Sequence, residues 1–82
     1  MIRLLFFARL RELLDCNELE LETVAGESVA QLAQRIVDQR GDVWQILLHE
    51  DTRCAINQEV VDYEATISDG DELAFFPPVT GG

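Results

Sequence analysis

The chain has no lysine, only one histidine and only two cysteines among its 82 residues. Its six basic residues are all arginines, against sixteen acidic residues, so the formal net charge is −10. Without lysine, the side chains offer no amine to which another copy could be joined by an isopeptide bond. So acidic a chain is unsuited to nucleic acid, because phosphates are bound by basic groups. The charge suits a basic or apolar protein partner, or serves solubility alone.

The scarcity of cysteine and histidine limits the chemistry that the chain can perform. Cys16 and Cys54 are too few and too far apart for a metal-ligand set or a disulfide framework. An iron–sulfur cluster would need four thiolates. His49 lies in a polar stretch and is expected to be an exposed loop residue rather than a catalytic base. We therefore expect neither a metal site nor a catalytic triad.

Long apolar runs are also missing. Residues 2–14 are apolar overall, but Arg3, Arg9 and Arg11 interrupt them, which is not the pattern of a secretion signal. No run is long enough to cross a membrane as a helix. These observations predict a cytoplasmic protein without membrane contact.

What the chain has is a regular alternation of strand and helix patterns in a length suited to one domain. The order is a strand, a short helix, a strand, a long helix, a second short helix, and then two or three strands. This order predicts an α+β domain in which one main helix crosses a mixed sheet of four to five strands. The patterns place strands over residues 2–8, 18–24, 53–57, 60–61 and 71–76, and helices over 8–15, 29–40 and 42–48.

The main helix carries the clearest local signals. Ser28 followed by Gln31 has the spacing of a capping box, and Gly41 stands where a C-terminal cap belongs. Its expected buried stripe is Val29, Leu32, Ala33, Ile36 and Val37. Further core residues expected from the short helices and the loop before the last strand are Leu10, Leu13, Leu14, Val43, Trp44, Ile46, Leu47 and Ile67.

The last eight residues, Phe-Phe-Pro-Pro-Val-Thr-Gly-Gly, begin as a strand and then lose the ability to pair. Pro77 and Pro78 have no N–H for a ladder and favour an extended path. Gly81 and Gly82 lack a Cβ, so another backbone can approach them closely. We expect a globular domain over residues 1–76 and an extended tail over 77–82 that can enter a narrow channel, although Gly-Gly is also common in frayed ends.

This terminal stretch resembles the end of the small subunits of molybdopterin synthase, a family of ubiquitin-like sulfur carriers. The opening residues 1–13 resemble the same family, as do Asn57-Gln58 and the Asp-Gly-Asp-Glu stretch at 69–72. The resemblance implies the β-grasp fold, in which the first and last strands lie side by side and parallel at the centre of the sheet. The apolar content of both strands agrees with such a covered central position.

The resemblance also implies a function centred on Gly82. An E1-like adenylating enzyme would use ATP to convert the Gly82 carboxylate into an acyl adenylate. The chain itself would bind no cofactor, because the ATP is used by that partner. A sulfurtransferase would then leave a thiocarboxylate. The tail would enter the large subunit of a heterotetramer of two large and two small subunits, and sulfur would pass to cyclic pyranopterin monophosphate. The chain itself has no phosphate-binding glycine loop and no basic cluster for ATP.

Site residues follow from the same resemblance. Gly82 would be catalytic, and Gly81 would keep the channel approach free of side chains. The rest of the tail would be the pointer, consisting of Pro77, Pro78, Val79 and Thr80. An apolar docking patch at its base would include Phe7, Val60, and one or both of Phe75 and Phe76. Because Phe75 and Phe76 are adjacent in a strand, they point to opposite faces, and we expect Phe76 to be the exposed one.

Three other functions remain open from the sequence. The chain could be a ubiquitin-like sulfur carrier for thiamine, cysteine or tRNA thiolation. It could be a protein modifier that is conjugated to the lysines of other proteins. It could also be a non-catalytic acidic interaction domain whose terminal glycines are incidental.

Overall fold

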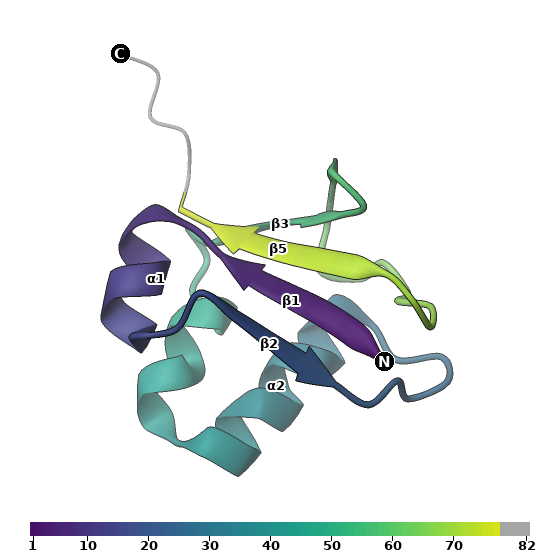
Figure 1. Cartoon of the computed structure of the whole chain (residues 1–82), viewed down its shortest axis with the longest axis horizontal. Helices are drawn as coiled ribbons and strands as arrows, with labels where there is room; N and C mark the ends of the chain where they lie inside the picture. Colours follow the sequence, from purple (N-terminus) through teal and green to yellow (C-terminus); the bar gives the residue numbers. More distant parts are fainter. Residues whose placement is uncertain (78–82) are drawn as a thin grey trace.

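The computed structural model describes residues 1–77, which form a mixed five-stranded sheet with its helices packed on one face (Figure 1). The strands run in the order β2-β1-β5-β3-β4 across the sheet. The α+β architecture predicted from the order of patterns is therefore confirmed. The strands are β1 (Ile2–Phe6), β2 (Glu18–Leu21), β3 (Arg53–Ile56), β4 (Glu59–Val61) and β5 (Glu72–Phe76).

The first and last strands form the parallel pair at the middle of the sheet. Leu4 is paired with Leu73, and Phe6 with Phe75, while β2 and β3 flank the pair in antiparallel registers. Covered inner faces explain why alternate residues of both strands are apolar and fully buried. Because β1 and β5 run in the same direction, the chain leaves β5 at the same end of the sheet at which β1 enters α1 (Figure 1).

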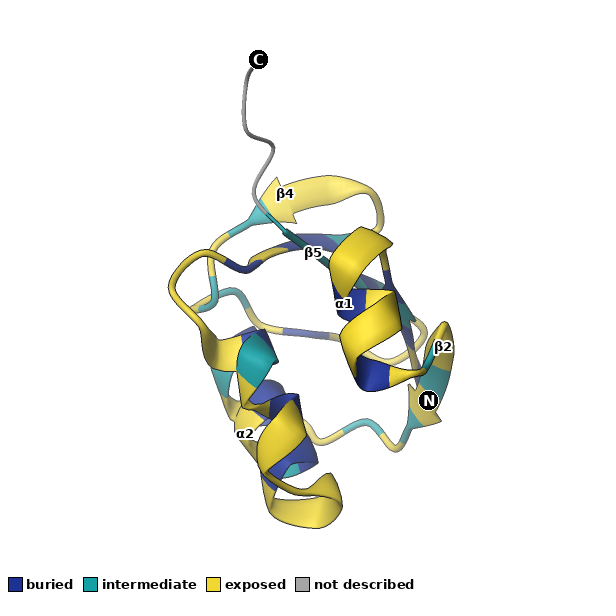
Figure 2. Cartoon of the chain, turned by 90° about the vertical axis from the view of Figure 1, so that its left-hand side faces the viewer, coloured by how far each residue is buried: buried dark blue, intermediate teal, exposed yellow. Residues whose placement is uncertain are grey.

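The main helix, α2 (Val29–Arg40), lies against the inner face of the sheet and presents its buried side to it (Figure 2). Its N-terminus has the predicted capping box: the Ser28 hydroxyl accepts from the Gln31 N–H at 3.2 Å, and the Gln31 amide oxygen accepts from the Ser28 N–H at 2.9 Å. All five residues of the predicted stripe are buried. The two shorter helices are α1 (Ala8–Leu14) and the 3-10 helix η1 (Asp42–Leu48).

Three aromatic rings form the centre of the core. Phe6 stacks on Phe75 with ring centroids 6.0 Å apart and meets Trp44 edge-on at 5.5 Å. Trp44 is thus the core anchor that the sequence predicted. Ile67 also fills the core as expected, from the loop that precedes β5.

Two apolar residues that we expected in the core lie instead at the surface. Leu13 is 51% exposed on α1, and Val43 is 57% exposed on η1. In a helix as short as α1, Leu10 and Leu14 already occupy the side that faces the core. In η1 the tighter 3-10 winding places Trp44 and Leu47, three residues apart, on the inner side and turns Val43 outward.

Two strands are shorter than predicted by two or more residues. β1 ends at Phe6 rather than at residue 8, because Ala8 adopts a left-handed φ of 52° and the chain turns directly into α1. β2 ends at Leu21 rather than at residue 24. The β3–β4 hairpin closes through Asn57 and Gln58, both at positive φ, which is the geometry of a two-residue turn of the primed type.

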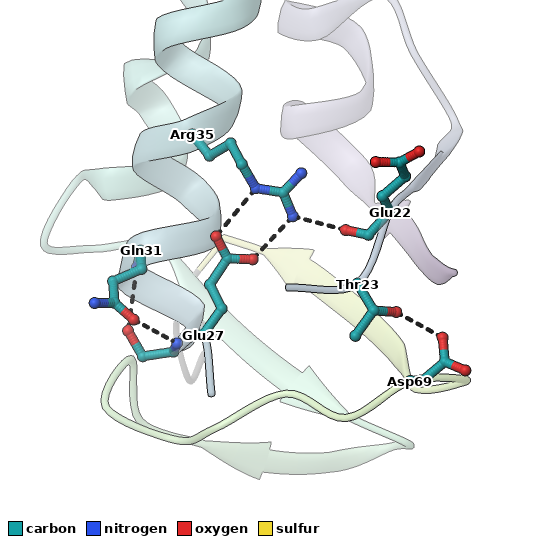
Figure 3. Close-up of polar contacts among 7 residues, drawn as sticks. Glu22, Thr23, Glu27, Gln31, Arg35 and Asp69 are labelled. Atoms are coloured by element: carbon teal, nitrogen blue, oxygen red, sulfur yellow. Dashed lines mark hydrogen bonds and ion pairs between the residues drawn. The ribbon is translucent and has the colours of Figure 1, made fainter. Parts of the chain in front are cut away.

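Polar contacts gather at the end of the sheet where β1 and β5 begin; we call this the anchored end (Figure 3). Arg35 makes a two-pronged ion pair with Glu27, at 2.8 and 3.0 Å, and donates to the Glu22 carbonyl at 2.9 Å. Asp69 accepts from the Thr23 hydroxyl at 2.6 Å and from the Met1 ammonium. These contacts tie α2, the segment after β2 and the loop before β5 to one another.

Candidate functional site

The outer face of the sheet carries an uncharged row that crosses four strands. Leu5 of β1 is paired with Ala74 of β5, which is paired with Ala55 of β3. Ala55 is in turn paired with Val60 of β4, which is 67% exposed. The helices cover the opposite face, so this row lies on the open side of the sheet (Figure 1).

A second row lies nearer the end at which β5 stops. Phe7 follows β1, donates its N–H to the Phe75 carbonyl at 3.1 Å, and is 44% exposed. Phe76 is half-buried at the end of β5 and is paired with Arg53 of β3. Together the rows form an apolar patch, which we define as Leu5, Phe7, Val60, Ala74 and Phe76. Apolar surface gathered in this way marks an interaction site more often than scattered exposed residues do.

The structure divides the two neighbouring phenylalanines as their alternation predicts. Phe76 belongs to the apolar patch, whereas Phe75 is fully buried against Phe6. The assignment of Phe75 to a docking surface is therefore corrected: its ring is part of the core and supports the patch from beneath. The geometry brings together Phe7, Val60 and Phe76 of the predicted docking residues on the open side of the sheet.

The predicted tail begins where the sheet stops. Pro77 follows β5 directly and is half-buried. The remaining predicted tail residues lie outside the described part of the chain, namely Pro78, Val79, Thr80, Gly81 and Gly82. β5 thus delivers the chain to Pro77 at the edge of the apolar patch.

Charged groups border the patch on the side of the anchored end. The Arg3 guanidinium donates to the Glu18 carboxylate at 2.7 Å and has Glu72 at 4.0 Å. The hydrogen bond to Glu18 and the charge beside it raise the pKa of Arg3. At the opposite end of the patch, where β5 stops, Arg53 is paired with Phe76 and donates to the Glu50 carbonyl at 2.8 Å. The patch is therefore an uncharged surface with an ordered polar rim, the arrangement common in protein interfaces.

Neither cysteine is arranged as a reactive thiolate. Cys54 is completely buried, and burial raises the pKa of its thiol to about 11. Its Sγ donates to the Val61 carbonyl at 3.4 Å, and Cys16 makes a similar contact with the Glu18 carbonyl. Because a thiolate is the reactive form of cysteine, Cys54 is unsuited to carry or transfer sulfur at neutral pH.

On the helix side of Pro77 lies a feature that the sequence did not reveal. A hollow of about 300 Å³, which we call the α1 hollow, opens between α1 and the turn after η1. Arg9 and Leu13 line one side of it, His49 lines the other, and Pro77 is at its edge. Only the spacing of Arg9 and Leu13, four residues apart on one helix, could have suggested a shared face.

No three or more His, Cys, Asp or Glu side chains within residues 1–77 are arranged to hold a metal ion. Among the helices in the same range, none is long and apolar enough to cross a membrane.

The fold, with its central parallel pair and one helix across the sheet, is that of a ubiquitin-like β-grasp domain. The model of the ThiS family matches residues 4–82, and the chain belongs to that family. A relative from Escherichia coli is 42% identical over 85 residues, and one from Haemophilus influenzae is 40% identical over 83 residues. Each alignment covers all of both proteins, and both relatives are named molybdopterin synthase sulfur carrier subunit. The family resemblance drawn from the terminal stretch is thereby confirmed.

Solved structures show the same fold. SAMP1 from Haloferax volcanii superposes with a TM-score of 0.75 at 25% identity, over 99% of this chain and 98% of that one. A chain from the complex of subunits 1 and 2 of the molybdopterin-converting factor of Helicobacter pylori superposes with a TM-score of 0.65. That likeness, at 22% identity over 99% of this chain and 97% of the other, concerns the fold alone.

Proposed function

We propose that this protein is the sulfur carrier subunit of a molybdopterin synthase. The observation that carries the proposal is the full-length identity of 40–42% with two proteins of that name. The geometry agrees with it, because β5 delivers the chain to Pro77 beside an uncharged patch. In this proposal residues 1–76 form the globular domain that docks on partners, and residues 77–82 form the tail that carries the sulfur.

The proposed chemistry takes place at the carboxyl group of Gly82. A carboxylate is a poor electrophile, so an E1-like adenylating enzyme first joins it to AMP from ATP and releases pyrophosphate. A sulfurtransferase then supplies a sulfur nucleophile that displaces AMP, and a thiocarboxylate results. Its anionic sulfur is nucleophilic, as an activated cysteine thiolate is. The thiocarboxylate sulfur attacks cyclic pyranopterin monophosphate in the large subunit, and water then cleaves the acyl–sulfur bond, which leaves the sulfur on the pterin and returns Gly82 to a carboxylate.

The proposed partner surface is the apolar patch. Phe7, Val60 and Phe76 would rest on the large subunit while the tail enters it, in a heterotetramer of two large and two small subunits. The Helicobacter pylori structure is a complex of subunits 1 and 2 of the molybdopterin-converting factor, which supports a large-subunit partner for this chain. We place the assembly in the cytoplasm.

Mass spectrometry of the C-terminal peptide tests the chemistry. The chain is incubated with ATP, the adenylating enzyme and a sulfur source, treated with a thiol-reactive probe, unfolded, and cleaved after Glu72. The resulting peptide, residues 73–82, contains neither cysteine nor methionine, so any thiol label on it reports Gly82. We expect the label, and an unlabelled peptide alongside a labelled control carrier would reject the proposal.

Removal of Gly82 gives the matching functional test. The shortened tail ends about 3.3 Å earlier, and sulfur transfer should fall by more than about 100-fold because misplacement of a reacting group is that costly. The melting temperature should stay unchanged, since Gly82 lies well beyond β5. An Asp38→Asn variant on the far side of the domain serves as the control and should retain activity.

A second assay separates the proposal from its nearest alternatives. The loaded protein is offered the large subunit with cyclic pyranopterin monophosphate, and dithiolene formation is measured. SAMP1, which shares the fold, is named small archaeal modifier protein 1, so a lysine-bearing protein is offered in parallel to detect conjugation. Sulfur transfer to the pterin supports the proposal, whereas amide-linked conjugates without pterin product would assign the chain to the protein modifiers.

A further inference from the structure

The α1 hollow has an apolar floor and lies beside the start of the tail. Leu10 and Thr52, both nearly buried, lie deepest in it. Leu13, half exposed, forms part of its wall, and Pro77 stands at its edge. The Thr52 hydroxyl cannot donate to a ligand, because it already donates to the Ile46 carbonyl at 2.7 Å. The space of about 300 Å³ accommodates one or two apolar side chains.

The rim of the hollow carries a positive charge that has no carboxylate partner within residues 1–77. In a chain of net charge −10, Arg3 and Arg35 are paired with carboxylates, and Arg40 lies over the Trp44 ring. Arg9 has no carboxylate within 4.0 Å among residues 1–77. An unpaired guanidinium beside exposed apolar surface suits a carboxylate from another protein.

The other ionisable groups that line the hollow are His49 and Asp51, which lie beside each other. The Nδ1 atom of His49 accepts from the Asp51 N–H at 3.1 Å, and the Asp51 carboxylate lies 3.7 Å from the same nitrogen. With Nδ1 acting as an acceptor, the neutral ring carries its proton on Nε2 and can donate there. Arg9 is therefore the strongest attractant for an anion at this rim.

The hollow and the apolar patch lie on opposite sides of the start of the tail. The patch is on the open face of the sheet, whereas α1 packs on the helix side (Figure 2). Pro77 borders both, since it follows Phe76 of the patch and lines the hollow. A protein that encloses the tail from Pro77 onward must bring its channel mouth against both surfaces.

We propose that the α1 hollow is a second docking site for the large subunit, which places an apolar side chain over Leu10 and a carboxylate against Arg9. This inference rests on the proposed function for the identity of the partner. The large subunit would then contact the start of the tail on two sides, at the apolar patch and at the hollow. Arg9 would favour a negatively charged surface of the large subunit at the hollow.

The test measures binding of the unloaded carrier to the purified large subunit by calorimetry. Arg9→Glu should weaken binding by at least about tenfold, because like charges would face each other. Arg11→Glu is the matched control: it makes the same change of charge on the same helix, away from the hollow. Leu13→Asn is compared likewise with Val43→Asn, since both residues are exposed aliphatic residues and only Leu13 lines the hollow.

Selective weakening by Arg9→Glu and Leu13→Asn, with a reduced salt dependence for the former, supports the second docking site. Equal effects in the control variants would overturn it, as would unchanged or tighter binding of Arg9→Glu. Tighter binding would show that the hollow holds the chain's own anionic tail. Thiocarboxylate formation and sulfur delivery are measured separately. If both are normal and Arg9→Glu does not change binding, the second docking site is refuted while the proposed function stands.

Discussion

The two ends of the β1–β5 strand pair are built from different chemistry. At the anchored end, Thr23 and Asp69, which are 46 residues apart, share a hydrogen bond, and Glu27 forms an ion pair with Arg35 of α2. At the tail end, β1 leads into Phe7, and β5 ends at Phe76 and is followed by Pro77. Phe7 and Phe76 belong to the apolar patch, and Pro77 lines the α1 hollow. The polar groups of the anchored end are bonded within the chain, whereas the tail end exposes apolar surface that a partner can cover.

This contrast has a physical reason. Polar contacts within a chain use up donors and acceptors, so the anchored end offers little to a partner. Apolar surface and an unpaired arginine keep their binding free energy until another protein covers them. The proposed carrier would dock in turn on several enzymes, which would require a rigid domain at one end and unsatisfied surface at the other.

The sharpest test of the contrast uses the two adjacent phenylalanines of β5. Phe75→Ala should lower the free energy of unfolding by about 3–5 kcal/mol, because it leaves a cavity beside Phe6 and Trp44. Phe76→Ala should cost only about 1 kcal/mol but weaken binding of the large subunit by tenfold or more, as loss of an interface anchor does. Urea unfolding and calorimetry measure the two effects. Equal destabilisation by both variants would contradict the division between core and surface.

The next test addresses the ion pair of the anchored end. Arg35→Met leaves Glu27, which is 7% exposed, without its partner, and should destabilise the fold by about 3 kcal/mol. The hydrogen bond to Glu27 also raises the pKa of Arg35, consistent with a favourable pair. The double variant Glu27→Gln/Arg35→Met should recover part of the loss, because the unpaired buried charge is gone. Additive losses in the urea midpoints would show that the two side chains do not interact.

The smallest effect is expected from Asp69 and concerns pH. Hydrogen bonds from the Met1 ammonium and from Thr23 lower the pKa of the Asp69 carboxyl below its ordinary value of 3.8. A carboxyl with a lowered folded-state pKa adds stability above its unfolded pKa, and the stability is lost as pH falls through the folded value. Below about pH 4 the wild type should therefore lose stability more steeply than Asp69→Asn. Thermal melts across this range check it, and parallel curves at low salt would contradict it.

Much of the fold could be predicted because its signals are local. The capping box at Ser28 and Gln31, the alternation of β1 and β5, and the turn before β5 each depend on neighbouring residues. The exposure of Val43 and Leu13 could not be predicted, because it depends on how short helices rotate against the rest of the fold. The same holds for Glu27, a turn residue whose buried carboxylate is paired with Arg35 of α2.

The candidate site divides in the same way. Adjacent strand residues point to opposite faces, so Phe76 could be favoured for the open face, where it lies half-buried. The inclusion of Phe75 in the docking patch was wrong, because its ring is buried in the core. The α1 hollow was missed because it joins α1, the turn after η1 and Pro77, which are distant in sequence. No pattern along the chain indicates that Arg9 lies near the start of the tail; only the folded arrangement does.

The parallel pairing of β1 with β5 has a mechanical consequence. A partner that grips or releases the tail pulls on Pro77 along the direction of β5. β5 is paired with β1 on one side and β3 on the other, so the load runs across both ladders in shear. Hydrogen bonds loaded in shear share the force and must break together, whereas a strand peeled from an edge loses them one at a time. The pairing of β5 on both sides therefore helps the domain to stay folded when force is applied at Pro77.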